Sequence, residues 1–281
     1  MTRDHWIAVG IASLTLCQPV SAEVAPGDIK LIQCPGAERT VVFAVNNRGD
    51  VAGECHMPDG PRAFVLRKGI FTTLHIPSAS ESRANGLNDR GDVVGNFFDE
   101  AEQREYGFLY SDGLVTKISV PNAETTASAI ANNGTIVGLY ELQDASGNSA
   151  GNYGFILEDG EYRFLSVPGA AYTAPSGINE RGAVVGVSDW GEGASYGFLF
   201  DGKNFIKAPA PDLRFNDIDN SSRIVGDDQY TCYIRRETED VVQFSVPGAV
   251  VISCTSISDS GYLTGWYGTG DGWIRSFLTR L

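Results

Sequence analysis

Basic residues and histidine are scarce in this 281-residue chain, which has 21 Lys and Arg against 35 Asp and Glu, and only three His. The formal net charge is −14. Because nucleic-acid phosphates are bound by Lys and Arg, and anionic membrane surfaces attract basic segments, neither is expected as a partner. A solvated acidic surface is compatible with solubility, with cation binding and with basic partners.

Long hydrophobic runs are absent except near the N-terminus, where an apolar run extends from Trp6 to Leu16 after the basic Arg3. Small residues follow at Val20-Ser21-Ala22. This pattern is typical of a secretory signal peptide, and the run is too short to span a bilayer. We predict a signal peptide at residues 1–22, a mature domain at residues 23–281, and a secreted or periplasmic protein with no membrane contact after cleavage.

The Cys-x-x-Cys spacing of a strong zinc site is also absent. Outside the predicted signal peptide, four cysteines remain, at Cys34, Cys55, Cys232 and Cys254. An even number in an oxidising compartment suggests two disulfides, for which three pairings exist. We favour Cys34–Cys55 and Cys232–Cys254, because each would join neighbouring repeats. A metal site using Cys34, Cys55, His56 and Asp59 is the alternative, and no metal or cofactor is our prediction.

What the sequence does contain is a nine-residue motif in six copies. Leu87–Gly95 reads LNDRGDVVG, and the other copies are Val45–Gly53, Ile130–Gly138, Ile178–Gly186, Ile218–Gly226 and Ile257–Gly265. An Asn or Asp begins a turn, a Gly suits a positive φ, and a β-branched pair starts the return strand. The motif therefore predicts a β-hairpin. Ser222 replaces the turn Gly in the fifth copy, so this hairpin should be the most strained.

The repeats also predict the fold. Their final glycines are spaced by 42, 43, 48, 40 and 39 residues, and each repeat holds four short strand signals. A period near 40 with four strands per repeat is typical of a β-propeller blade. We therefore predict an all-β, six-bladed propeller as a single domain.

The two ends of the chain should share the last blade. The sequence ends on a third-strand signal, at Ile274–Leu281, and the missing fourth strand is found at Ile29–Ala37. That segment reads IKLIQCPGA and matches VVQFSVPGA at Val241–Ala249, which ends the fifth repeat. A ring closed by the N-terminal strand leaves no open break between its blades.

These motifs resemble a family of bacterial proteins with HAF-type extracellular repeats. The likeness rests on the Gly-Ile-Asn-x-x-Gly pattern, the Gly-Phe pair and the Val-Pro-Gly-Ala ending, as in Ile178–Gly186, Gly197-Phe198 and Val167–Ala170. The His-Ala-Phe triplet itself is replaced, for example by Arg62-Ala63-Phe64. The resemblance implies an exported repeat protein, and it implies no reaction.

Propeller topology predicts where a ligand could bind. The loops between second and third strands vary in length and are rich in acidic and aromatic residues, as binding loops are. Aromatic rings beside carboxylates suit sugars or cations. The predicted ligand-binding residues are Tyr140, Trp190, Asp227, Asp228, Tyr230, Trp266, Tyr267 and Trp273. Packing of these rings between the blades, with the acids solvated, is the alternative.

The leading functional interpretation is a monomeric binding or interaction scaffold with a carbohydrate or protein ligand on these loops. The alternative is a hydrolase or lyase that uses loop carboxylates such as Asp227 and Asp228. A catalytic triad would have to use His56, since His75 falls on an outer strand. The turn at Asn88–Asp92 superficially resembles a calcium loop, although later copies lose its second Asp.

Overall fold

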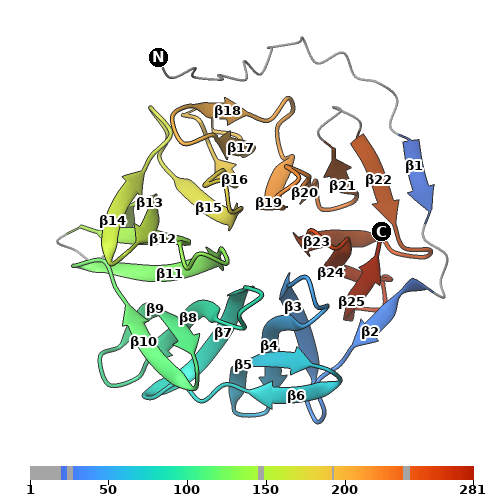
Figure 1. The fold of residues 1–281 in the computed structure, drawn as a ribbon, viewed down its shortest axis with the longest axis horizontal. Helices are drawn as coiled ribbons and strands as arrows, with labels where there is room; N and C mark the ends of the chain where they lie inside the picture. The colour runs from blue at the N-terminus through green and yellow to red at the C-terminus, as the bar shows by residue number, and fades with distance from the viewer. Residues whose placement is uncertain (1–19, 24–27, 145–148, 192, 237–240) are drawn as a thin grey trace, which may run out of the picture.

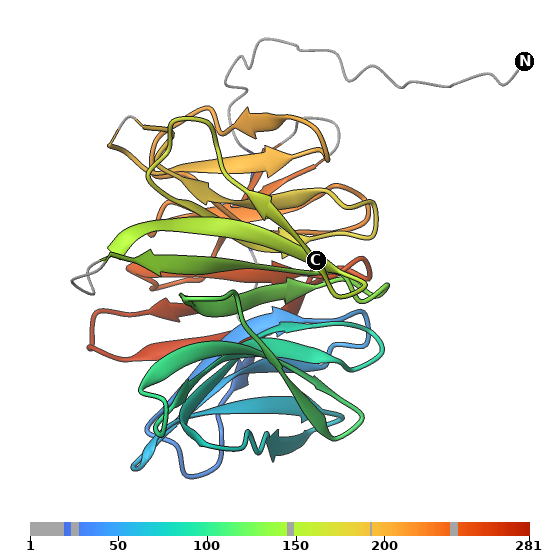
Figure 2. The same cartoon turned by 90° about the vertical axis from the view of Figure 1, so that its left-hand side faces the viewer.

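Six β-sheets form a ring around a central axis in the computed structural model of this chain (Figure 1). The structure describes residues 20–23, 28–144, 149–191, 193–236 and 241–281. Seen from the side, the strands run between the two faces of the ring (Figure 2). The predicted six-bladed propeller is confirmed. Within the described residues, no helix is long and apolar enough to cross a membrane.

Each blade has four antiparallel strands, which run in order from the axis outward. Blade 1 contains β3 (Arg39–Val45), β4 (Val51–Met57), β5 (Gly60–Arg67) and β6 (Ile70–Thr73). Blade 2 contains β7 (Ala79–Leu87), β8 (Val93–Asp99), β9 (Arg104–Ser111) and β10 (Leu114–Ile118). Blade 3 contains β11 (Ala123–Ile130), β12 (Ile136–Gln143), β13 (Ser149–Glu158) and β14 (Glu161–Leu165).

The second half of the chain repeats this order. Blade 4 contains β15 (Thr173–Ile178), β16 (Val184–Ser188), β17 (Tyr196–Phe200) and β18 (Phe205–Lys207). Blade 5 contains β19 (Arg214–Ile218), β20 (Ile224–Asp227), β21 (Cys232–Arg235) and β22 (Val241–Ser245). Blade 6 contains β23 (Val251–Ile257), β24 (Tyr262–Gly268), β25 (Ile274–Arg280) and the N-terminal β2 (Lys30–Ile32).

The repeated motif forms the turn between the first and second strands, as predicted. In blade 2, Oδ1 of Asn88 accepts hydrogen bonds from the backbone N–H groups of Gly91 and Asp92, at 3.0 and 2.9 Å. Gly91 has φ of +94°, a conformation that costs Gly little. Ser222 adopts the same region, with φ of +58°. The fifth turn therefore holds a non-Gly residue in a disfavoured conformation, as expected from the sequence.

The closing Gly of the motif is required by close packing within the blade. A Cβ added to Gly95 would lie 1.8 Å from the carbonyl oxygen of Arg83 on β7. The same collision, at 1.9 to 2.2 Å, would occur at the other five closing glycines, which are Gly53, Gly138, Gly186, Gly226 and Gly265. Each Gly lies beside a β-bulge in the first strand. The bulge was not predicted, and it explains why this position tolerates no side chain.

Phenylalanine forms much of the buried core between blades. The third strands of five blades each contribute a fully buried ring, from Phe64, Phe108, Phe155, Phe198 and Phe277. Burial of each such ring stabilises the fold by roughly 1.5–3 kcal/mol. In blade 5 the corresponding residue, opposite the closing Gly226, is the partly buried Tyr233. A different ring, Phe244 on the outer strand β22, is buried in that blade.

The N-terminal strand closes the ring, which confirms the predicted closure. Strand β2 pairs antiparallel with β25, so that Leu31 lies opposite Phe277. A further segment, β1 (Val20–Glu23), pairs in parallel with β22 of blade 5. This segment spans the predicted cleavage site, whereas residues 1–19 lie outside the described part of the chain. The signal peptide therefore stays a prediction.

Both favoured disulfides are present. Cys34, which follows β2 of blade 6, is bonded to Cys55 on β4 of blade 1. Cys232 on β21 of blade 5 is bonded to Cys254 on β23 of blade 6. Blade 6 is thus covalently joined to both of its neighbours. Because Cys34 and Cys55 are consumed in a disulfide, the alternative metal site has lost two of its ligands.

Candidate functional site

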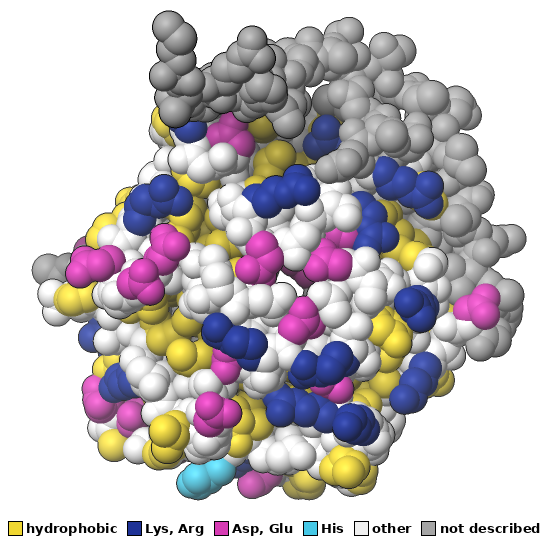
Figure 3. Space-filling model, in the orientation of Figure 1, with side chains coloured by type: hydrophobic (Ala, Val, Ile, Leu, Met, Phe, Trp, Pro, Cys, Tyr) yellow, Lys and Arg dark blue, Asp and Glu magenta, His cyan; other side chains and the backbone are white. Residues whose placement is uncertain are grey.

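The two faces of the ring differ in construction. We call the side formed by the first-to-second-strand and third-to-fourth-strand turns the turn face, and the side formed by the second-to-third-strand loops and the connections between blades the loop face. Figure 3 shows the turn face, where acidic side chains lie around the axis and Lys and Arg side chains lie farther out.

A closed circuit of hydrogen bonds runs around the axis on the turn face. The backbone N–H of Asn47 in blade 1 donates to Oδ1 of Asp89 in blade 2, at 2.8 Å, and the backbone N–H of Asp89 donates to Oδ1 of Asn132 in blade 3, at 2.7 Å. The pattern continues through Glu180 in blade 4, Asn220 in blade 5 and Asp259 in blade 6. Ser260 then donates to Asn47, at 2.9 Å, and completes the circuit.

Amides and carboxylates alternate around this circuit, in the order Asn47, Asp89, Asn132, Glu180, Asn220 and Asp259. The alternation lets neighbours bond twice. Nδ2 of Asn47 donates to Asp89 at 2.7 Å, and Nδ2 of Asn132 donates to the same carboxylate at 2.9 Å. Asp89 therefore links three blades, and its oxygens are used in holding the ring together.

The bulged residues form a second set of links between blades. Asn85 donates from Nδ2 to the carbonyl of Ala127 in the next blade, at 3.0 Å. Ser176, Asn216 and Thr255 make the corresponding bonds to Phe215, Cys254 and Val42. These contacts join first strands to one another along the axis.

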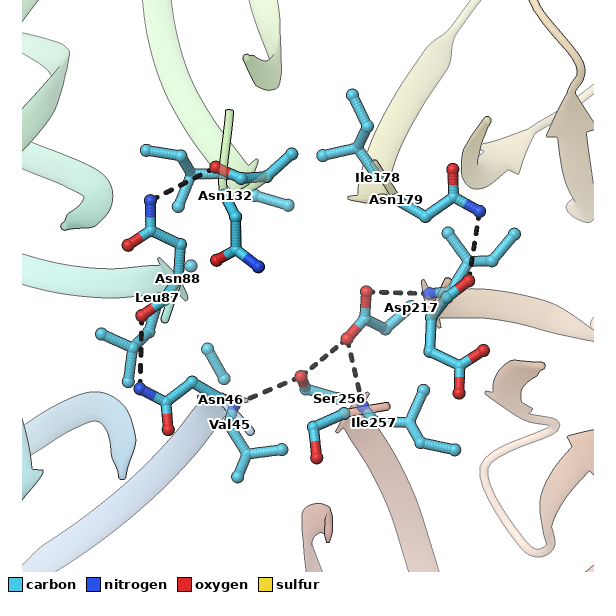
Figure 4. A pocket seen from close by; sticks show the side chains of 18 of the residues that line it. Val45, Asn46, Leu87, Asn88, Asn132, Ile178, Asn179, Asp217, Ser256 and Ile257 are labelled. Carbon is cyan, nitrogen blue, oxygen red and sulfur yellow. Dashed lines mark hydrogen bonds between the residues drawn. The ribbon is translucent and has the colours of Figure 1, made fainter. Parts of the chain in front are cut away.

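A narrow cavity of about 90 Å³ lies on the axis, lined by the first strands and the turn residues (Figure 4). The residue after each bulge differs between blades. It is small in blades 1 to 4, where it is Ala44, Gly86, Ala129 and Gly177, and polar in blades 5 and 6, where it is Asp217 and Ser256. A Cβ on Gly86 would lie 2.8 Å from the Cα of Ala129, so close approach of neighbouring strands explains the small residues.

Asp217 is the one carboxylate at this level of the cavity. A Cβ added to Gly177 would lie 2.7 Å from its Oδ1, so the glycine makes room for the carboxylate. Its Oδ2 accepts bonds from the Ser256 hydroxyl, at 2.7 Å, and from the N–H of Ile257, at 3.1 Å (Figure 4). Burial raises the pKa of Asp217 to about 7, although these hydrogen bonds oppose the shift. No sequence pattern had assigned this residue a role.

The two loop carboxylates predicted to bind ligand make hydrogen bonds within the fold. Asp227 is only 2% exposed and accepts bonds from Asn216, Ser253 and the N–H of Gln229. Asp228 accepts bonds from the N–H groups of Tyr230 and Thr231 and from the hydroxyl of Tyr233. Such bonding shapes a loop, as Asp often does in turns.

Four of the predicted aromatic residues are wholly or partly packed into the blades. Tyr140 contacts the rings of Tyr153 and Phe164, with centroids 5.7 and 5.1 Å away. Tyr267 is buried and Trp266 partly buried on β24. Trp190 packs against the core between blades 3 and 4, and its buried Nε1 makes no hydrogen bond to any residue that the structure describes. These rings contribute to the stability of the blades.

Tyr230 and Trp273 are the two predicted aromatic residues that are mostly exposed, at 72% and 59%. Tyr230 lies in the loop between β20 and β21 of blade 5, and Trp273 lies between β24 and β25 of blade 6. The loop face thus carries available rings on adjacent blades.

His56, the only candidate for a triad, is engaged with an acidic residue. Its Nε2 lies 2.7 Å from Oε1 of the buried Glu54, and Nε of Arg83 in blade 2 lies 2.7 Å from the other carboxylate oxygen. Within the described residues, no group of three or more His, Cys, Asp or Glu residues has an arrangement that could hold a metal ion.

Comparisons with known proteins identify the fold and no family. No protein-family model and no curated protein matches this chain. Among solved structures, it resembles a gluconolactonase from Xanthomonas campestris, with 14% identity, a TM-score of 0.58 and coverage of 91% of each chain. It resembles virginiamycin B lyase from Staphylococcus aureus, with 13% identity, a TM-score of 0.52 and coverage of 90% and 100%.

A third similar structure is regucalcin, a calcium-binding protein from Agrobacterium tumefaciens, with 10% identity, a TM-score of 0.54 and coverage of 92% and 95%. At these identities the likeness shows the propeller fold alone, since one fold supports many functions. The functional argument must therefore rest on the residues of this chain.

Proposed function

We propose that this chain is an exported binding scaffold that holds its ligand on the loop face. The observation that carries the proposal is the exposure of Tyr230 and Trp273 on neighbouring loops. On the turn face, by contrast, the amide and carboxylate side chains around the axis are already engaged in the hydrogen-bonded circuit between blades. Exposed aromatic side chains on capped loops are typical of recognition sites.

Three features support export. Two disulfides favour an oxidising compartment, and residues 1–22 have the pattern of a signal peptide. The resemblance to the HAF-type repeat proteins supports the same location. We propose that the mature protein is secreted or periplasmic and carries out its function as a monomer.

A hydrolase or lyase is the second candidate, and one observation favours it. Asp217 has a pKa near neutrality within the axial cavity, and a general acid or base is most effective with such a value. The loop carboxylates Asp227 and Asp228 are weaker candidates, because hydrogen bonds within the fold already engage them. If the protein is an enzyme, we therefore expect its catalytic group to be Asp217 in the axial cavity.

The proposal can be tested by screening glycan and peptide arrays with the wild-type protein and two variants. Trp273→Ala alters the loop face, and Arg90→Ala, on the turn face, is the control. We expect a ligand that is lost with Trp273→Ala, kept with Arg90→Ala, and recovered unchanged by mass spectrometry. Loss of the ligand only with Arg90→Ala would overturn the proposal, and a cleaved ligand would favour the enzyme.

A further inference from the structure

We propose that the exposed surface formed by Tyr230, Val250 and Trp273, here called the aromatic platform, binds the apolar face of an uncharged sugar chain. This inference rests on the proposed function and adds the chemical class of the ligand. Carboxylates and aromatic rings together would suit either a sugar or a cation, and the structure distinguishes these possibilities by showing what each carboxylate does.

The two loops of the platform are linked through the segment that enters blade 6. The segment that enters blade 6 lies between the two loops, because the N–H of Ile252 donates to the carbonyl of Gln229, at 3.2 Å, and the N–H of Val250 donates to Gly268, at 2.8 Å. A Cβ on Gly270, in the loop that carries Trp273, would lie 3.9 Å from the Val250 side chain. Val250 is itself 56% exposed, so an apolar residue lies between the two aromatic loops.

The carboxylate beside Tyr230 is committed to its own loop. Asp228 accepts the N–H groups of Tyr230 and Thr231 on Oδ1, at 3.0 and 2.7 Å, and the Tyr233 hydroxyl on Oδ2, at 2.9 Å. Both oxygens therefore hold the loop backbone that carries Tyr230. A cationic ligand stacked on Tyr230 would compete with these donors for the carboxylate.

The carboxylate beside Trp273 is neutralised by an arginine. Nη2 and Nη1 of Arg275 donate to Asp271 at 2.5 and 3.3 Å, and Oδ1 of Asp271 also accepts the N–H of Trp273, at 3.1 Å. The hydrogen bond from Arg275 holds the pKa of Asp271 far below its usual range. Because Arg275 and Asp271 form a pair with no net charge, a cation stacked on Trp273 would gain little attraction from this carboxylate.

A neutral sugar chain satisfies these constraints. Its C–H faces pack on aromatic rings without needing a free charge, and its hydroxyl groups can bond to polar groups at the edge, such as the exposed side chain of Gln229. An anionic polymer is disfavoured by the net charge of −14. A stable protein interface needs about 800 Å² on each partner, more than three side chains provide.

The capped loops also lower the cost of binding. The backbone that carries each ring is ordered before the ligand arrives, because Asp228 and Asp271 accept hydrogen bonds from the backbone N–H groups of Tyr230 and Trp273. Fewer rotatable groups must then be ordered in the complex, which leaves more of the contact energy for affinity. This explains why acidic residues occur beside exposed rings without contacting a ligand.

Affinity electrophoresis of the full chain in gels containing one polysaccharide each tests the proposal. The neutral probes are starch, galactomannan and β-glucan, and the charged probes are pectin and chitosan. We expect retardation by at least one neutral polymer, unchanged when NaCl rises from about 50 to about 500 mM. Tyr230→Ala and Trp273→Ala should each weaken this binding about tenfold, and Trp273→Phe should retain part of it.

Leu114→Ala is the matched control, since Leu114 is 73% exposed on the outer strand of blade 2. This variant should bind as the wild type does, and all variants should unfold at the same urea concentration. The sugar assignment is overturned if no neutral polymer retards the wild type, if both aromatic variants bind normally, or if only pectin or chitosan binds. Binding of a peptide that Trp273→Ala abolishes would overturn the sugar assignment and leave the proposed function standing.

Discussion

The turn face and the loop face are built from the same six repeats, yet they use polar side chains in opposite ways. On the turn face, Asp89 accepts bonds from two neighbouring blades and helps to close the circuit. On the loop face, Asp228 bonds only within its own loop and blade. The turn-face carboxylate therefore contributes to the integrity of the whole ring, whereas Asp228 shapes the loop that contains it.

The difference also explains where covalent links are found. The circuit on the turn face includes every blade, but the two disulfides occur only where blade 6 meets blades 5 and 1. These are the two boundaries of the blade assembled from both ends of the chain. The covalent links reinforce the blade whose strands are least connected in sequence.

Removing a disulfide should have the largest effect on stability. The Cys34→Ala/Cys55→Ala double variant should lower the free energy of unfolding by about 3 kcal/mol, because the unfolded chain gains entropy when a loop of this length is opened. Urea unfolding without reductant measures the loss. The Cys232→Ala/Cys254→Ala variant should lose a similar amount. A wild-type curve for both variants would show that the hydrogen-bonded circuit alone holds blade 6.

The axial cavity should make the stability depend on pH. The pKa of Asp217 is raised from 3.8 to about 7, so the folded state binds a proton more tightly than the unfolded state does. The free energy of unfolding should therefore fall as the pH rises from about 4 through about 7, by an amount on the order of 3 kcal/mol. Asp217→Asn should flatten this part of the profile, measured by urea unfolding. An unchanged slope in the variant would assign the dependence to other groups.

Matched acidic residues on the two faces should differ in their effect on stability. Asp89→Ala leaves donors on two blades unpaired and should cost about 2 kcal/mol, whereas Asp228→Ala disturbs one loop and should cost about 1 kcal/mol. Amide hydrogen exchange would show which blades lose stability in each variant. We expect faster exchange in blades 1 to 3 for Asp89→Ala and only around residues 228–233 for Asp228→Ala. Equal, ring-wide changes would contradict the difference between the faces.

The smallest effect should come from the exposed ring of blade 5. Tyr230→Ala should change the free energy of unfolding by less than about 0.5 kcal/mol, because the side chain is 72% exposed and buries little area. Trp190→Ala, measured in the same way, should be clearly destabilising because the Trp190 ring packs against a core cluster. A larger loss for Tyr230 than for Trp190 would reverse the division between exposed and packed rings.

Much of the fold could be predicted because the repeats are local signals. The turn Asn and Gly, the closing Gly and the Gly-Phe pair each depend on residues near them in sequence, and the match between Ile29–Ala37 and Val241–Ala249 revealed the closure. The alternating amides and carboxylates of the turn-face circuit were visible at the third position of every copy. Their pairing could not be seen, because it joins residues about 40 positions apart.

The site was less predictable for a physical reason. An Asp in a loop looks the same in sequence whether it binds a ligand or caps the loop, and Asp227 and Asp228 do the second. The aromatic residues posed the same problem, since Trp190 and Trp273 both follow second strands but only Trp273 is mostly exposed. Asp217 lies on an inner strand, and its raised pKa depends on burial among several blades, which no local pattern shows.

The shared last blade also sets an order of events during synthesis. Strand β2 is made before the strands of the other five blades, but its partner β25 is made after them. Until then the strand has no sheet to join. The bond between Cys34 and Cys55 spans only 21 residues, so it can form as soon as blade 1 has emerged. It then tethers β2 beside the gap that blade 6 will fill, at a high effective concentration. The Cys34–Cys55 disulfide would therefore hold β2 in place until β25 is available to pair with it.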